Sequence, residues 1–159
     1  MKRRPRVAAG RSTRSGIVVV RPGAGQRIAR NGATMTVKAS AKSSGRVLTC
    51  IETLDPPGYR ALPHIHRHAT EAFYVLEGTY SFETRAQRRR CTAGSFVLVR
   101  PNTLHGYRSG RAGGRLLIIY SPAGLDELFR ALAASRRASD QNKTAARFGT
   151  VWLERRPTR

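Results

Sequence analysis

The sequence predicts an all-β domain, either a sandwich or a barrel, followed by one helix. Short runs of β-branched and aromatic residues recur between turns that contain glycine and proline. No long segment with helical periodicity interrupts residues 16–120. The chain has 159 residues, enough for one domain that buries a hydrophobic core without disulfides.

The predicted strands lie between clear turn signals. In chain order they are Ile17–Val20, Thr34–Lys38, Val47–Leu54, Ala72–Leu76, Thr79–Thr84, Arg88–Cys91, Phe96–Val99 and Arg115–Tyr120. The turns between them are predicted at Pro22-Gly23, Asp55-Pro56-Pro57-Gly58, Glu77-Gly78 and Ala93-Gly94. Many short strands with such punctuation are typical of sandwiches and barrels.

A helix is predicted after the last strand. Ser121-Pro122 resembles an N-cap with proline at the first helical position. Four apolar residues then recur with helical spacing, as expected for a stripe that packs against a sheet: Leu125, Leu128, Phe129 and Leu132. We expect this helix to complete a domain of residues 16–135. Residues 1–15 are predicted to form a basic disordered tail, and residues 136–159 a basic C-terminal extension.

The formal net charge of +21 is the most unusual feature of the composition. Arginine accounts for 26 of the 30 basic residues, and the excess lies largely in residues 1–30 and 136–159. Solvated tails explain this distribution, and salt-sensitive attraction to nucleic acid or an anionic surface is the alternative. No recognition helix, zinc finger or RNA-binding aromatic motif accompanies the charge, so no specific nucleic-acid partner is expected.

The apolar runs also indicate where the protein resides. Leu116–Tyr120 and similar runs are too short to span a bilayer, so no membrane partner is expected. No apolar stretch follows the basic N-terminus, which argues against a signal peptide and favours a cytoplasmic location. The two cysteines, Cys50 and Cys91, have no metal-binding spacing. We expect reduced thiols, with a disulfide between them as the open alternative.

Three of the four histidines lie within five residues, and their spacing predicts a metal site. Side chains at i and i+2 of a strand project to the same face, so His64 and His66 point into one space. Glu71 begins the next apolar strand, and His105 follows a turn. Imidazole and carboxylate together suit one divalent ion of iron, manganese, nickel, copper or zinc. His68 falls outside this inward pattern and is expected at the rim.

A resemblance to a known family rests on these same residues. From Gly58 the chain reads G-YRALP-H-I-H-RHAT-E-AFYVLE-G and matches the first cupin motif, G-x5-H-x-H-x4-E-x6-G, at every defined position. From Gly94 it resembles the second motif, G-x5-P-x-G-x2-H-x3-N, with Arg100, Asn102 and Ser109 in place of proline, glycine and asparagine. Asparagine tolerates the left-handed conformation, so that exchange is mild. The chain is therefore similar to small quercetinase-like monocupins.

The resemblance implies a jelly-roll β-barrel with a C-terminal helix and a metal held by three histidines and one glutamate. It also implies that Glu71 doubles as a catalytic base toward a bound substrate. The expected function is a metal-dependent, dioxygenase-like oxygenase acting on a small organic molecule. The alternatives are another cupin metalloenzyme, such as an isomerase or cyclase, and a non-catalytic small-ligand-binding cupin, because this fold hosts many functions.

Alternation along the strands predicts the wall of a substrate pocket. Phe73 and Val75 share a face with Glu71, and Tyr107 shares one with His105. Tyr80 and Phe82 extend the predicted wall. Core packing is the alternative for all five, because small barrels fill their interiors with side chains. A homodimer is also expected, since pairing covers exposed strand edges, and Ile17–Val20 is the candidate for strand exchange.

Overall fold

The computed structural model describes residues 16–135 and 137–153. It contains nine strands and two helices within these ranges. The strands are β1 (Gln26–Arg30), β2 (Ala33–Ala39), β3 (Thr49–Asp55), β4 (Arg60–His66), β5 (Thr70–Glu83), β6 (Arg88–Thr92), β7 (Phe96–Val99), β8 (His105–Ser121) and β9 (Thr150–Trp152). The helices are α1 (Leu125–Ala134) and α2 (Ala138–Arg147). The predicted tail at residues 1–15 lies outside the described residues.

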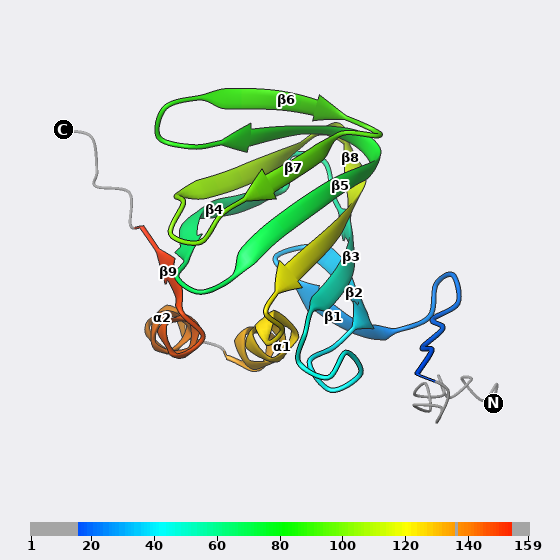
Figure 1. The fold of residues 1–159 in the computed structure, drawn as a ribbon. Helices are drawn as coiled ribbons and strands as arrows, with labels where there is room; N and C mark the ends of the chain where they lie inside the picture. Colours follow the sequence, from blue (N-terminus) through cyan, green and yellow to red (C-terminus); the bar gives the residue numbers. More distant parts are fainter. Residues whose placement is uncertain (1–15, 136, 154–159) are drawn as a thin grey trace, which may run out of the picture.

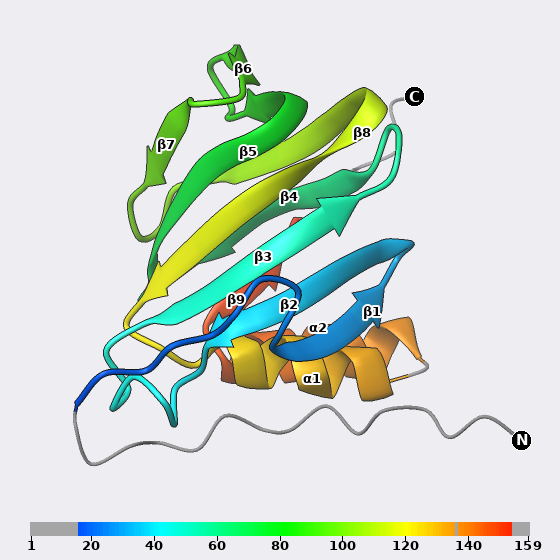
Figure 2. The same cartoon turned by 90° about the vertical axis from the view of Figure 1, so that its right-hand side faces the viewer.

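All strands form one antiparallel sheet that curls into a half-barrel of the jelly-roll type (Figure 1). One path through the sheet runs β1-β2-β3-β8-β4-β9, and β5 joins β8 to β6 and β7. The two longest strands, β5 and β8, pair along most of their length and form the spine of the sheet (Figure 2). The all-β prediction is confirmed.

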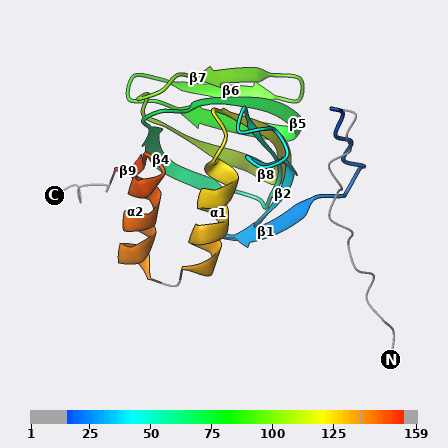
Figure 3. The same cartoon turned by 60° about the horizontal axis from the view of Figure 1, so that its bottom comes forward.

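The two helices lie side by side and cover the open side of the half-barrel (Figure 3). Helix α1 packs against β1 and β3, and α2 packs against β9. Buried Asp126 fastens α1 to the sheet, since its carboxylate accepts hydrogen bonds from Thr49 Oγ1 at 2.7 Å and the Ala41 amide at 3.1 Å. Leu128 and Leu132 therefore face the interior of the half-barrel, where both are fully buried. Within the described residues no helix combines the length and apolar character of a membrane span.

Several predicted boundaries were wrong, each for a local reason. The segment Ile17–Val20 forms no strand, and most of it is exposed. Glu77-Gly78 makes no turn, because β5 runs through it with shifts of register on either side. Gly78 adopts a positive φ of 80° and approaches the backbone of Gly113 so closely that a Cβ atom has no room. Helix α1 begins after Gly124 rather than at Ser121-Pro122.

Residues 136–159 contain two elements that the sequence reading did not anticipate. Helix α2 and strand β9 lie in this segment, and β9 pairs with β4. Ala145 and Thr150 are buried against the rest of the fold. This pairing brings the C-terminal segment beside the strand that carries His64 and His66.

A buried carboxylate in the core should give the fold a measurable pH dependence. Burial raises the pKa of Asp55 from 3.8 to about 6, and this outweighs the hydrogen bonds that its Oδ2 accepts from Tyr80 and Thr53. The folded state therefore holds the proton more tightly than the unfolded state. The stability that this bound proton contributes to the fold is fully present below the pKa of Asp55 in the unfolded state. It is lost as the pH rises through about 6.

We predict that Asp55→Asn removes this pH dependence. Between about pH 4 and pH 7 the wild type should lose roughly 2 kcal/mol of unfolding free energy relative to the variant. Urea denaturation of both proteins across this range measures the difference. A gap between the two proteins that stays constant with pH would contradict the prediction.

Candidate metal centre

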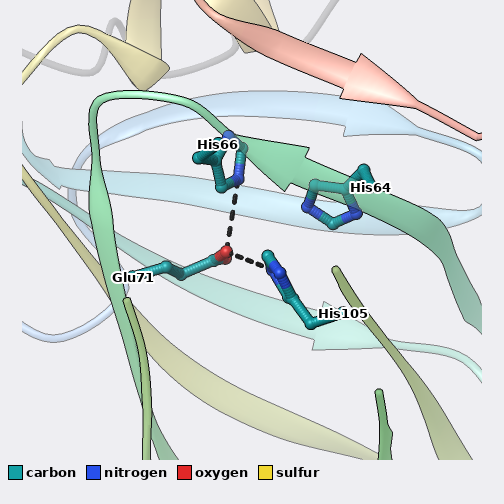
Figure 4. A group of neighbouring side chains, drawn as sticks. All are labelled: His64, His66, Glu71 and His105. Atoms are coloured by element: carbon teal, nitrogen blue, oxygen red, sulfur yellow. Dashed lines mark hydrogen bonds and ion pairs between the residues drawn. The ribbon is translucent and has the colours of Figure 1, made fainter. Parts of the chain in front are cut away.

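Three adjacent strands bring four ionisable side chains to one buried point (Figure 4). Along β4 the alternation of the chain buries His64 and His66 and leaves Ile65 between them on the other face. His64 pairs directly with His105 across the β4–β8 ladder. Glu71, the second residue of β5, enters from the neighbouring strand. The possible ligand atoms of these residues all lie within 4.8 Å of one another.

Glu71 lies at the centre of the contacts within this cluster. Its Oε2 accepts a hydrogen bond from His105 Nε2 at 2.7 Å and lies 3.2 Å from His66 Nε2. The contact with His66 lacks hydrogen-bond alignment, so His66 Nε2 is a buried nitrogen without a hydrogen-bond partner among the described residues. All four side chains are buried, with at most 9% of each residue exposed.

The other nitrogen of each imidazole is held by a second contact. Nδ1 of His64 donates to the Leu62 carbonyl at 2.7 Å, and Nδ1 of His105 donates to the Thr103 carbonyl at 2.9 Å. Nδ1 of His66 lies 2.8 Å from the Thr150 hydroxyl. Such contacts fix the ring orientation and direct the ε-nitrogens toward a common ligand, as is usual for metal-binding histidines.

The surroundings of His64, His105 and Glu71 shift their pKa values differently, so these side chains differ in protonation state. Burial lowers the pKa of His64 to about 4, and the neighbouring charge of His105 adds to this effect, so the His64 imidazole is neutral at pH 7. Burial also opposes charge on His105, but the hydrogen bond to Glu71 outweighs it and raises the His105 pKa. For Glu71, burial is outweighed by contacts with His105 and His66, which lower its pKa well below the usual range. Glu71 is therefore ionised.

The donor set fits a divalent cation. Three imidazoles and a carboxylate are the ligands that first-row transition metals prefer. A buried carboxylate beside an unpaired His66 Nε2 is unfavourable without a compensating cation. In the cluster as observed, both nitrogens of His105 face acceptors, so this ring is an imidazolium. A metal ligand must give up that Nε2 proton, which makes metal binding compete with protons.

A cavity of about 420 Å³ opens onto the cluster. Its wall includes His64, His66 and Glu71 on one side and side chains of both helices on the other. The apolar part of the wall comes from the sheet and from α1: Met35, Ile118, Leu128, Phe129 and Leu132. A cavity of this size and character accommodates a small organic molecule.

The structure places the predicted residues in two different groups. His64, His66, Glu71 and His105 come together as predicted, and exposed His68 lies outside the cluster. Among the predicted pocket residues, Tyr107 lines the cavity. Phe73, Val75, Tyr80 and Phe82 lie in the hydrophobic core, outside the lining of this cavity, where Phe73 and Tyr107 pack edge to face.

Two residues of the site were missed by the sequence reading. Thr150 holds His66 because the β4–β9 register places the two opposite each other. Tyr120 is paired with Glu71 across the β5–β8 ladder and packs edge to face on the His66 ring. Both contacts depend on strand pairing between distant segments. Asn102, in contrast, adopts the left-handed φ of 62° that was expected at its position.

Both cysteines are free thiols. Cys50 lies on β3 and Cys91 on β6, which do not pair with each other. Burial raises the pKa of the Cys50 thiol, which keeps it protonated and unreactive.

Loss of the Thr150 hydroxyl should weaken metal binding without removing a ligand. We predict that Thr150→Val lowers the affinity for zinc by about 10- to 100-fold, because His66 loses the contact that orients its ring. Thr150→Ser keeps the hydroxyl and should retain most of the affinity. Competition with a chromophoric chelator measures both, and wild-type affinity in Thr150→Val would refute this role.

Comparisons with known proteins agree with the fold and the site. Residues 50–120 match the model of the cupin domain family. The chain is 28% identical to quercetin 2,3-dioxygenase of Bacillus subtilis over 114 residues, which cover 72% of this chain and 34% of that protein. This chain therefore spans about a third of that relative's length.

Solved structures show the same fold. A predicted oxalate decarboxylase from Thermotoga maritima superposes with a TM-score of 0.60 and 20% identity, over 66% of this chain and 99% of the other. An RmlC-like cupin from Shewanella frigidimarina gives a TM-score of 0.57 and 23% identity, over 65% and 88%. The family match spans the strands that carry all four cluster residues, and the solved structures share the fold, so this chain is similar to cupins and has the cupin fold.

Proposed function

We propose that this chain binds one divalent metal ion through His64, His66, Glu71 and His105 and oxygenates a small organic molecule. The observation that carries the proposal is the convergence of four possible ligand atoms at one buried point, where His64, His66 and Glu71 line a largely apolar cavity. The similarity to a quercetin 2,3-dioxygenase supports an oxygenase over other metal-dependent reactions. Iron, manganese, nickel, copper and zinc all suit the ligand set.

A divalent ion at such a site supplies Lewis-acid or redox chemistry to a substrate that reaches it through an oxygen atom. The chain's own residues divide the remaining work. His64, His66 and His105 hold fixed ring orientations through their Nδ1 contacts. The apolar wall from the sheet and α1 is suited to hold and orient the body of the substrate.

Glu71 is proposed as both a ligand and the base that takes a proton from a substrate hydroxyl. Its carboxylate is ionised and borders the cavity, two properties that a base requires. Tyr120 lies opposite Glu71 on the neighbouring strand β8 and also lines the cavity.

Metal analysis of protein purified without a histidine tag tests the site itself. Wild-type protein should carry about one equivalent of metal per chain. We predict that His64→Ala and His105→Ala each lose most of it. His68→Ala is the matched control, since His68 is an exposed histidine next to the cluster, and it should keep the wild-type content. Full metal content in the first two variants would rule out this ligand assignment.

Oxygen consumption tests the reaction. Protein loaded separately with iron, manganese, nickel or copper should consume dioxygen with at least one member of a panel of flavonols and diketones. We predict that Glu71→Gln slows this uptake by about 100-fold or more, because the amide cannot accept the substrate proton. The metal content of the variant is measured alongside to separate lost ligation from lost proton transfer. Metal binding without oxygen consumption by any loaded form would exclude the oxygenase.

A further inference from the structure

One arginine in the cavity wall has no acidic partner among the residues that the structure describes. Arg30 ends β1, two residues after buried Ile28, and shares its inward face. Its side chain lines the same cavity as the metal cluster. By contrast, Arg27 lies on the other face of the strand and is exposed.

The guanidinium of Arg30 packs over the ring of Trp152, with its central carbon 5.7 Å from the ring centroid. Trp152 is the cross-strand partner of His64, so the contact lies beside the metal cluster. This stacking occupies one face of the guanidinium and leaves its N–H donors free.

The lack of a partner for Arg30 contrasts with the other partly buried basic side chains. Lys38, Arg115 and Arg130 each pair with a carboxylate. Among residues 16–135 and 137–153, no hydrogen bond or ion pair satisfies the guanidinium of Arg30. Burial also lowers its pKa, which reflects partial removal from water. A half-buried cation with free donors in a cavity wall is suited to an anionic ligand.

We propose that the cavity takes a small planar or aromatic carboxylate, whose carboxyl group pairs with Arg30 while an oxygen at its other end reaches the metal cluster. This inference deepens the proposed function by naming its substrate class, and it rests on that function for the second contact. The apolar wall and the Trp152 ring suit a flat, largely apolar body between the two ends.

The charged side chains in the cavity wall favour a ligand with a single negative charge. Arg60 also lines the cavity, but Glu83 lies 4.0 Å from its guanidinium. Tyr59 lies near Arg30, and burial raises its pKa to about 12, so its hydroxyl is neutral. One unpaired guanidinium balances one carboxylate, whereas a phosphate monoester would bring a second charge without a partner. A carboxylate also matches the planar donor pair of arginine.

Paired probes test the proposal. We use 3,4-dihydroxybenzoate with 3,4-dihydroxybenzamide, and 3,4-dihydroxycinnamate with its amide, because each pair differs only in the charge at one end. Calorimetric titration of zinc-loaded protein avoids turnover. The wild type should bind at least one carboxylate about tenfold or more tightly than its amide. High salt in every titration screens the general attraction of the basic chain for anions.

Substitutions on both faces of β1 test whether Arg30 causes the preference for carboxylate over amide. Arg30→Gln should abolish the preference for carboxylate over amide, and its continued binding of the amide would show that the cavity is intact. Arg30→Lys should keep part of the preference, since it retains the charge but loses the planar fork. Arg27→Gln removes the same charge from the exposed face and should bind as the wild type does.

Three results would overturn the inference: equal binding of acid and amide by the wild type, a preference that survives in Arg30→Gln, or no binding of any probe. Its failure is separable from that of the proposed function. Trp152 is the chain's single tryptophan, so its fluorescence reports cavity binding by metal-free protein too. A protein that binds no metal but keeps the Arg30-dependent preference would refute the metalloenzyme and retain the carboxylate site.

Discussion

The contact between Glu71 and His105 is the interaction on which the site depends. A carboxylate and an imidazolium 2.7 Å apart are both buried, and neither is stable there without the other. His66 lies next to this pair with one nitrogen unpaired, and neutral His64 completes the group. The charges of Glu71 and His105 cancel, but His66 Nε2 has no hydrogen-bond partner among the described residues. A divalent cation that displaces the His105 proton would compensate the Glu71 charge in its place and would also give His66 Nε2 a partner.

Strand pairing, rather than loop conformation, holds this group in place. His64 is opposite His105, His66 is opposite Thr150, and Glu71 is opposite Tyr120. Each ligand therefore has a neighbour whose position is fixed by a ladder of backbone hydrogen bonds. Sites built on strands in this way are held more tightly than sites on loops. The long strands β5 and β8 matter because each carries a ligand and joins the halves of the sheet.

The four cluster residues were predictable from sequence because they follow a local rule. A period of two places His64 and His66 on one face, and the motif spacing identifies Glu71 and His105. Thr150 and Tyr120 follow no such rule, since only the pairing of distant strands brings them to the site. The false turn at Glu77-Gly78 has a similar origin. Gly78 was interpreted as a turn residue, but it lies within the continuous strand β5. Its lack of a side chain allows the backbone of Gly113 on β8 to come close.

The C-terminal segment shows why composition alone was a poor guide to the site. Residues 136–159 are polar and basic, yet part of this segment forms α2 and β9 and closes one side of the cavity. Thr150 on β9 orients His66, and Trp152 two residues later stacks on Arg30 from the opposite end of the sheet path. Thr150 and Trp152 lie on the same face of the three-residue strand β9. This short strand therefore positions both His66 and Arg30. Ligand binding at Arg30 and ion binding at His66 are therefore expected to stabilise the same short strand.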